Sequence, residues 1–105
     1  MDKREAVRVP VQVRARCRSQ GVVIDGLVED VSRNGLFLRA SNSISEGSEV
    51  ELDLDLPGEA PLRLLVEVVR VESGPQGVGM GLRFVQPGRS RPLANFIMRQ
   101  HQASR

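Results

Sequence analysis

Three strand signals follow one another in the stretch VPVQVRARCRSQGVVIDGLVEDVSRNGLFL, residues 9–38. In its first nine residues Val, Ala and Cys alternate with Pro, Gln and Arg, which is the period of a strand with one buried face. A polar gap separates this run from a second apolar run, inside which Asp25-Gly26 predicts a bulge or a tight turn. Asn34-Gly35 then predicts a turn before a third strand. The stretch therefore predicts consecutive antiparallel strands of an all-β protein.

The strand pattern continues beyond this stretch. Apolar residues alternate with acidic ones from 50 to 56, so this strand has one solvated face. Residues 62–71 are apolar on both phases, which predicts a strand that is buried on both faces or one that bends at a barrel corner. Residues 78–84 alternate again, and their glycines on one face allow another element to approach closely. Ser90 is placed to cap a terminal helix.

These elements predict one domain over residues 1–105. Hairpin spacing favours a small six-stranded antiparallel β-barrel over residues 9–87, because closure removes exposed strand edges. A short C-terminal α-helix is expected over 90–102. Residues 1–8 contain no large apolar anchor and are expected to form a flexible arm.

Composition argues against an enzyme and against a metal protein. The chain has one cysteine and one histidine, so a Ser-His-Asp triad, a metal cluster and an internal disulfide are not expected. Cys17 occupies the apolar phase of its strand and is interpreted as a buried structural thiol. The acidic row over residues 49–55 is interpreted as a solvated strand face. No apolar run resembles a signal peptide or a membrane span, and a reducing cytoplasm is the expected location.

Charge is concentrated at the N-terminal end of the chain. Residues 1–18 contain six basic and two acidic side chains, a net charge of +4, whereas the remainder contains nine basic and eleven acidic ones, a net charge of −2. Fourteen of the fifteen basic residues are Arg, whose planar fork of donors suits phosphates and base edges. The distribution predicts an anionic partner.

Two short motifs flank the first two predicted strands. Residues 4–8, REAVR, form an Arg-x-x-x-Arg segment before the first strand, and residues 30–35, DVSRNG, form an Asp-x-Ser-x-x-Gly turn after the second. Together they resemble the PilZ domain family, in which a further Arg often stands where this chain has Lys3. Residues 79–85, GMGLRFV, resemble the last barrel strand of that family. The resemblance extends from Lys3 to about Met98 and implies binding of the second messenger cyclic di-GMP (c-di-GMP) without catalysis.

The resemblance, together with the chemistry of the ligand, assigns the main site residues. Arg4 and Arg8 are expected to grip guanine edges and phosphates, because an Arg fork pairs with guanine O6 and N7. Asp30 supplies an acceptor for guanine N1–H and N2–H₂, and Ser32 can donate to or accept from a base or a phosphate. Gly35 lets the backbone approach the ligand. No cofactor is expected besides this ligand.

Five further residues are secondary candidates for the ligand site. Lys3 lacks the bidentate geometry of Arg, and Arg33 and Asn34 lie within the motif turn. No aromatic residue stands where some relatives stack a guanine on a late strand, so Arg70, and less so Arg39, is the expected replacement.

Three interpretations remain open at this point. The leading one is a c-di-GMP receptor whose arm becomes ordered on binding and signals to an unidentified protein partner. The second is a PilZ-like protein-docking module that binds no nucleotide. The third is a small RNA- or DNA-binding barrel, which is disfavoured because single-strand binders stack bases on aromatic side chains and this chain has only three, all Phe. Nucleic-acid binding and membrane insertion are therefore not expected.

Overall fold

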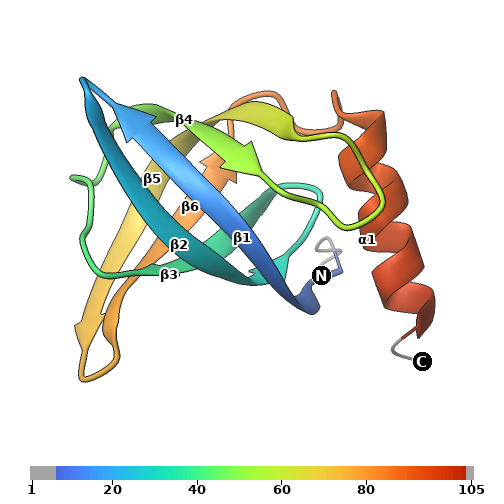
Figure 1. Ribbon diagram of the computed structural model, residues 1–105, viewed down its shortest axis with the longest axis horizontal. Helices are drawn as coiled ribbons and strands as arrows, with labels where there is room; N and C mark the ends of the chain where they lie inside the picture. The colour runs from blue at the N-terminus through green and yellow to red at the C-terminus, as the bar shows by residue number, and fades with distance from the viewer. Residues whose placement is uncertain (1–6, 104–105) are drawn as a thin grey trace, which may run out of the picture.

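The computed structural model describes residues 7–103, which form a closed barrel of six antiparallel strands followed by one helix (Figure 1). Neighbouring strands pair in the order β1-β2-β3-β6-β5-β4, and β4 pairs with β1 to close the barrel. The elements are β1 (Val9–Ser19), β2 (Val22–Val31), β3 (Gly35–Ala40), β4 (Glu49–Leu54), β5 (Leu62–Gly74), β6 (Gly77–Phe84) and α1 (Arg91–Ala103). This confirms the predicted barrel with a C-terminal helix. The expected arm, residues 1–8, is described only at Val7 and Arg8.

The first hairpin shows why the opening stretch folds as it does. The alternate apolar residues of β1 point inward, and Val13, Ala15 and Cys17 are almost completely buried. The turn to β2 consists of Gln20 and Gly21, whose φ angles are 50° and 81°. Two consecutive positive φ angles define the two-residue hairpin turn that matches the twist of antiparallel strands. The polar gap is thus a tight turn.

One prediction about the strands is wrong, and for another the structure favours one of two alternatives. Asp25-Gly26 is neither a bulge nor a turn, because both residues lie in the regular part of β2, paired with Arg16 and Ala15. The run 62–71 is not buried on both faces, because Leu65 is 45% exposed. The irregularity between Val68 and Arg70 fits the alternative expectation of a strand that bends. The bend at this bulge reverses the phase of the apolar residues, which explains why both phases look apolar in the sequence.

The core is mostly aliphatic, with Phe84 and Phe96 as its aromatic members, and is closed at one end of the barrel by α1. Leu93 and Phe96 of the helix are buried in the same cluster as the inward side chains of the strands, and Figure 1 shows α1 at the end of the barrel where β1 begins. Ser90 caps the helix as predicted, since its hydroxyl accepts a hydrogen bond from the Leu93 amide at 3.2 Å. Cys17 is fully buried, and burial raises the pKa of its thiol to about 11, as expected for a structural cysteine. Within the described residues, no helix is long and apolar enough to span a bilayer.

Candidate functional site

Four strands contribute one cross-strand row of residues to the outer face of the barrel. Asp30 of β2 is paired with Phe37 of β3, Phe37 with Gly81 of β6, and Gly81 with Arg70 of β5. Residues paired directly across neighbouring strands point to the same face of a sheet. The neighbours of Phe37 in β3 are buried in the core, so the row lies on the outside. The row thus contains, in order, the carboxylate of Asp30, the ring of Phe37, the space left by the absent side chain of Gly81 and the guanidinium group of Arg70.

Two irregularities in the pairing aim the charged members of this row outward. One lies between Val28 and Asp30 in the pairing of β2 with β3, and the other lies between Val68 and Arg70 in the pairing of β5 with β6. A one-residue change of register turns a side chain to the opposite face. Without these shifts Asp30 and Arg70 would point into the core, where an unpaired charge is strongly unfavourable.

Phe37 forms the floor of the site because a glycine lies beneath it. A Cβ atom at Gly79 would overlap the Phe37 Cζ and would lie 2.8 Å from its Cε2. The guanidinium carbons of Arg39 and Arg70 lie 5.3 and 5.6 Å from the centre of the ring, within the range of cation–π contact. These contacts leave Phe37 only 8% exposed. The ring therefore supports two arginine side chains, whose planes are available for stacking.

A groove of about 660 Å³ lies over this floor. Arg8 enters it from the segment before β1, and its Nη2 donates to Asp30 Oδ1 at 2.6 Å. On the other wall, Arg70 Nε forms an ion pair with Glu72 Oε2 at 2.8 Å. The groove contains four arginines and three acidic residues, so a dianionic ligand would find a net excess of one positive charge.

The remaining arginines of the groove are also paired. Arg39 donates from Nε and Nη2 to the two carboxylate oxygens of Glu29, at 3.1 and 3.2 Å, and this hydrogen bonding raises the pKa of Arg39. Arg83 donates to Glu67. Each arginine of the groove is therefore held in place by a carboxylate, and an incoming anion would compete with that carboxylate. Among residues 7–103 no cluster of His, Cys, Asp and Glu is arranged to hold a metal ion.

The motif turn between β2 and β3 is held together by Ser32. The buried Ser32 hydroxyl accepts from the Asn34 amide at 3.2 Å and donates to the Gly35 carbonyl at 3.4 Å. The Ser32 amide also donates to that carbonyl, at 2.8 Å. Gly35 has a packing role, because a Cβ there would collide with the Leu82 carbonyl oxygen of β6. Ser32 and Gly35 therefore fix the turn that carries Asp30 and Asn34.

The structure brings most of the predicted site residues together. Those that line the groove are Arg8, Asp30, Asn34, Gly35, Arg39 and Arg70. Ser32 lies buried within the turn, and Arg33 lines a different cleft. Lys3 and Arg4 lie outside the described residues.

Sequence reasoning missed the floor of the groove and its acidic partners. The groove residues that were missed are Glu29, Leu36, Phe37, Val69, Glu72, Gly81, Leu82 and Arg83. One signal was available for Phe37, because it occupies the outward phase between two leucines and lies opposite a glycine-rich strand. The pairing of each arginine with a carboxylate depends on the register of the strands and has no local signal.

Comparison with solved structures identifies the fold. The c-di-GMP-bound PilZ domain of Escherichia coli YcgR is 12% identical, with a TM-score of 0.80 and coverage of 99% of this chain and 95% of that one. The Bacillus subtilis inhibitor of motility MotI/DgrA is 20% identical, with a TM-score of 0.80, over 100% of this chain and 55% of that chain. The PilZ domain of CeSA from a cellulose-synthesizing bacterium is 17% identical, with a TM-score of 0.67, over 95% of this chain and all of that one. At these identities the likeness shows a shared fold.

Sequence comparison identifies the family. No curated protein matches the sequence at a significant level. The family model of the PilZ domain matches residues 2–99, a span that includes both motifs, all six strands and most of α1. On this match, the chain belongs to the PilZ domain family.

Proposed function

We propose that this domain is a non-catalytic receptor that binds c-di-GMP in the groove over Phe37 and signals to a protein partner. The observation that carries the proposal is the contact between Arg8 and Asp30, which are 22 residues apart and 2.6 Å from each other. This contact unites the Arg-x-x-x-Arg segment with the Asp-x-Ser-x-x-Gly turn at one end of the groove. The similarity to the YcgR domain, whose structure contains c-di-GMP, supports the same ligand class.

The groove offers a complementary group for each part of c-di-GMP. The Arg8 fork suits guanine O6 and N7 or a phosphate, and the Asp30 carboxylate suits the guanine N1–H and N2–H₂ donors. The guanidinium planes of Arg39 and Arg70 lie over Phe37 and provide a surface on which a guanine can stack. Stacking on these arginines would replace stacking on an exposed aromatic side chain, since Phe37 itself is covered.

Replacing the present ion pair of Arg8 by ligand contacts is energetically favourable. The Arg8 side chain is 55% exposed and that of Asp30 is 35% exposed. An exposed ion pair contributes about 0–1 kcal/mol, whereas a charge-assisted hydrogen bond to a ligand contributes about 1.5–3 kcal/mol. A few such contacts reach roughly micromolar affinity after association costs of at least about 4 kcal/mol.

The rest of the predicted set has supporting roles in this proposal. Arg4 joins Arg8 on the ligand, with Lys3 as a weaker contact, and Asn34 supplies a polar group beside Asp30. Ser32 acts indirectly by fixing the turn, as its hydrogen bonds within the turn indicate. Ligand contact with the segment before β1 would then alter the surface that a partner recognises.

Calorimetry tests the proposal directly. Wild-type protein is titrated with c-di-GMP and with GTP, beside Arg8→Ala and the control Arg16→Ala. Arg16 is a matched control because it is also on the N-terminal side, is 51% exposed and is paired with Asp25 at 3.3 Å, away from the groove. We expect saturable binding of c-di-GMP that weakens at least tenfold in Arg8→Ala and is retained in Arg16→Ala. Hydrogen exchange of residues 2–9 in the same samples is expected to slow when ligand is present.

Other outcomes would point to the alternative functions. Absence of c-di-GMP binding at high micromolar ligand would refute the receptor function and favour a docking module that needs no nucleotide. Equal affinity of the two variants would refute the role of Arg8. Stronger binding to random oligonucleotides, with a steep salt dependence, would favour a nucleic-acid-binding barrel.

A further inference from the structure

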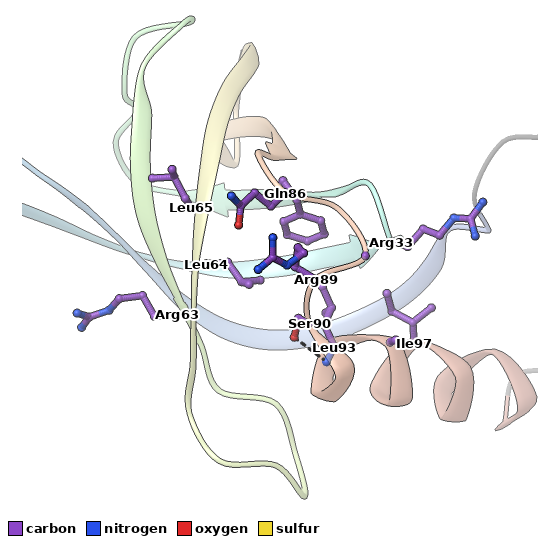
Figure 2. Close-up of a pocket in the computed structure, with 12 residues that line it drawn as sticks. Arg33, Arg63, Leu64, Leu65, Gln86, Arg89, Ser90, Leu93 and Ile97 are labelled. Atoms are coloured by element: carbon purple, nitrogen blue, oxygen red, sulfur yellow. Dashed lines mark hydrogen bonds between the residues drawn. The ribbon is translucent and has the colours of Figure 1, made fainter.

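A second hollow lies between α1 and the ends of β5 and β6, away from the groove. It is a cleft of about 140 Å³, drawn in Figure 2. Its walls are mostly apolar and are formed by Leu64, Leu65, Phe84, Leu93 and Ile97. Leu65 is 45% exposed, although it is a large aliphatic side chain on the barrel surface. An open cleft with an apolar lining is the kind of surface that receives a side chain of another molecule.

Arginines surround this apolar cleft, and none of the described residues lining it is acidic. Figure 2 shows Arg89 over the middle of the cleft, whereas Arg33 and Arg63 extend outward on opposite sides. Arg63 is engaged with Asp53, at 2.7 Å. Arg33 and Arg89 have no ion pair with any residue of the described part of the chain. This differs from the groove, where every arginine is already paired with a carboxylate.

We propose that the cleft docks an acidic segment of a partner protein through one large apolar side chain. The cleft volume of about 140 Å³ matches one inserted side chain, because an apolar protein cavity of about 150 Å³ accommodates benzene, which is the size of a Phe ring. An apolar centre with a charged rim is the usual anatomy of a protein interface, and arginine is enriched there. Arg33 and Arg89, which no carboxylate of residues 7–103 neutralises, select a partner with carboxylates beside its apolar anchor.

The location of Arg33 links this cleft to the groove. Arg33 lies in the same turn as Asn34 and Gly35, which line the groove, while Arg33 itself lines the cleft. Strand β5 also passes both hollows, with Leu65 at the cleft and Val69 at the groove. Any adjustment of the turn on ligand binding would therefore move a partner-binding arginine. This regulatory part of the proposal rests on the proposed c-di-GMP function.

Titration of ¹⁵N-labelled full-length protein with synthetic peptides tests the docking without c-di-GMP. The probe is a decapeptide of Glu and Asp around one central Phe, and the matched peptides have Ala in place of Phe or Lys in place of the acidic residues. We expect shifts at the residues of the cleft with the probe, and at least tenfold weaker binding with either matched peptide. Arg33→Ser/Arg89→Ser is expected to weaken probe binding at least tenfold. The control Arg14→Ser/Arg16→Ser removes the same charge from the exposed face of β1 and is expected to retain binding.

Several outcomes would overturn the docking surface. Two of them are failure of the probe to bind at millimolar peptide concentration and chemical-shift changes that centre on β1 instead of the cleft. Equal affinity for the probe and the Ala peptide, or an equal loss of affinity in both double variants, would refute the proposal as well. Tighter binding of an oligonucleotide or of anionic phospholipid vesicles at the same residues would assign the cleft to another class of partner and would also refute the proposal.

Repeating the titration with saturating c-di-GMP separates docking from regulation. We expect the dissociation constant of the probe to change at least threefold. If calorimetry shows that the protein is saturated with c-di-GMP and the dissociation constant of the probe is unchanged, the coupling between the groove and the cleft is refuted. The proposed docking surface is not affected by that result. If calorimetry shows no c-di-GMP binding at all, the proposed function fails, and the result without ligand still decides the docking surface.

Discussion

Replacing Gly79 by Ala tests the packing that creates the groove. The new Cβ would overlap the Phe37 Cζ and would lie 2.8 Å from its Cε2, whereas carbon atoms normally pack at about 3.5–4.0 Å. The ring must therefore move by about 1 Å or more, toward the guanidinium groups above it. Gly81 provides a matched control on the same face of β6, because a Cβ there would lie 3.4 Å from the Arg70 Cβ, close to an ordinary contact. Neither glycine has a positive φ, so both changes act through sterics.

The two substitutions are expected to differ clearly in stability. Overpacking of a filled site costs about 1–3 kcal/mol, and the reduced entropy of the unfolded chain returns about 0.4–1 kcal/mol. The net destabilisation of Gly79→Ala is therefore about 1–2 kcal/mol, which corresponds to a Tm lower by roughly 4–15 °C for a domain of this size. Gly81→Ala is expected to lie within about 0.5 kcal/mol of wild type, since its new contacts, with the Arg70 Cβ at 3.4 Å and the Val69 Cγ2 at 3.7 Å, are at the short end of ordinary packing distances and offset much of the entropic gain.

Thermal unfolding followed by circular dichroism, with urea titration as a second measurement, distinguishes the two variants. Displacement of Phe37 also moves the arginines that it supports, so Gly79→Ala is expected to bind c-di-GMP at least fivefold more weakly than Gly81→Ala. Equal stability of the two variants would show that Phe37 does not occupy the space above Gly79. That result would refute the description of the groove floor.

Two further predictions concern the stability of the barrel. Arg63 and Arg18 hydrogen-bond to Asp53 and lower the pKa of its carboxyl to about 2 from 3.8, so its stabilising contribution is present above about pH 4 and is lost as the pH falls through about 2. Asp53→Asn is expected to lower the free energy of unfolding by about 1 kcal/mol at pH 7, after solvent screening. A urea titration at pH 2 should show only a small part of this difference, and a constant difference at both pH values would contradict the ion-pair assignment. Ser90→Ala removes the cap of α1 and is expected to lower the free energy of unfolding by about 1 kcal/mol, measured as a Tm lower by roughly 4–8 °C. In the control Ser90→Thr the hydroxyl is kept, and most of the stability is expected to remain.

Features encoded within a few residues could be predicted from the sequence. The alternation in β1, the turn before β2 and the Ser90 cap each depend on local geometry, and the structure contains all three. The barrel followed from the number of such strands, because an open sheet of this size would leave two unpaired edges. The motif turn was also located correctly. The burial of the Ser32 hydroxyl within that turn was not predicted, because a buried and an exposed serine cannot be told apart in a single sequence.

The composition of the groove could not be predicted, because it depends on which residues lie opposite each other in separate strands. Phe37 lies near Gly79 and Arg70 only after two strand pairings, β3 with β6 and β5 with β6, have been fixed. The acidic partners of the arginines follow from the same pairings. Arg70 was predicted as a substitute for a stacking aromatic residue, which stays a prediction, but the sequence could not show that a buried phenyl ring supports its guanidinium group.

The two bulges beside the groove bring charged side chains to one outer face of the barrel. If the pairing of β5 with β6 continued regularly from Val68 and Leu82, Arg70 would lie opposite Met80, which is fully buried. The extra residue instead places Arg70 opposite Gly81, on the outer face and beside open space. The bulge in β2 does the same for Asp30. A regular strand would bury both charges, so the two bulges are what allow Asp30 and Arg70 to lie at the groove in which we propose that c-di-GMP binds.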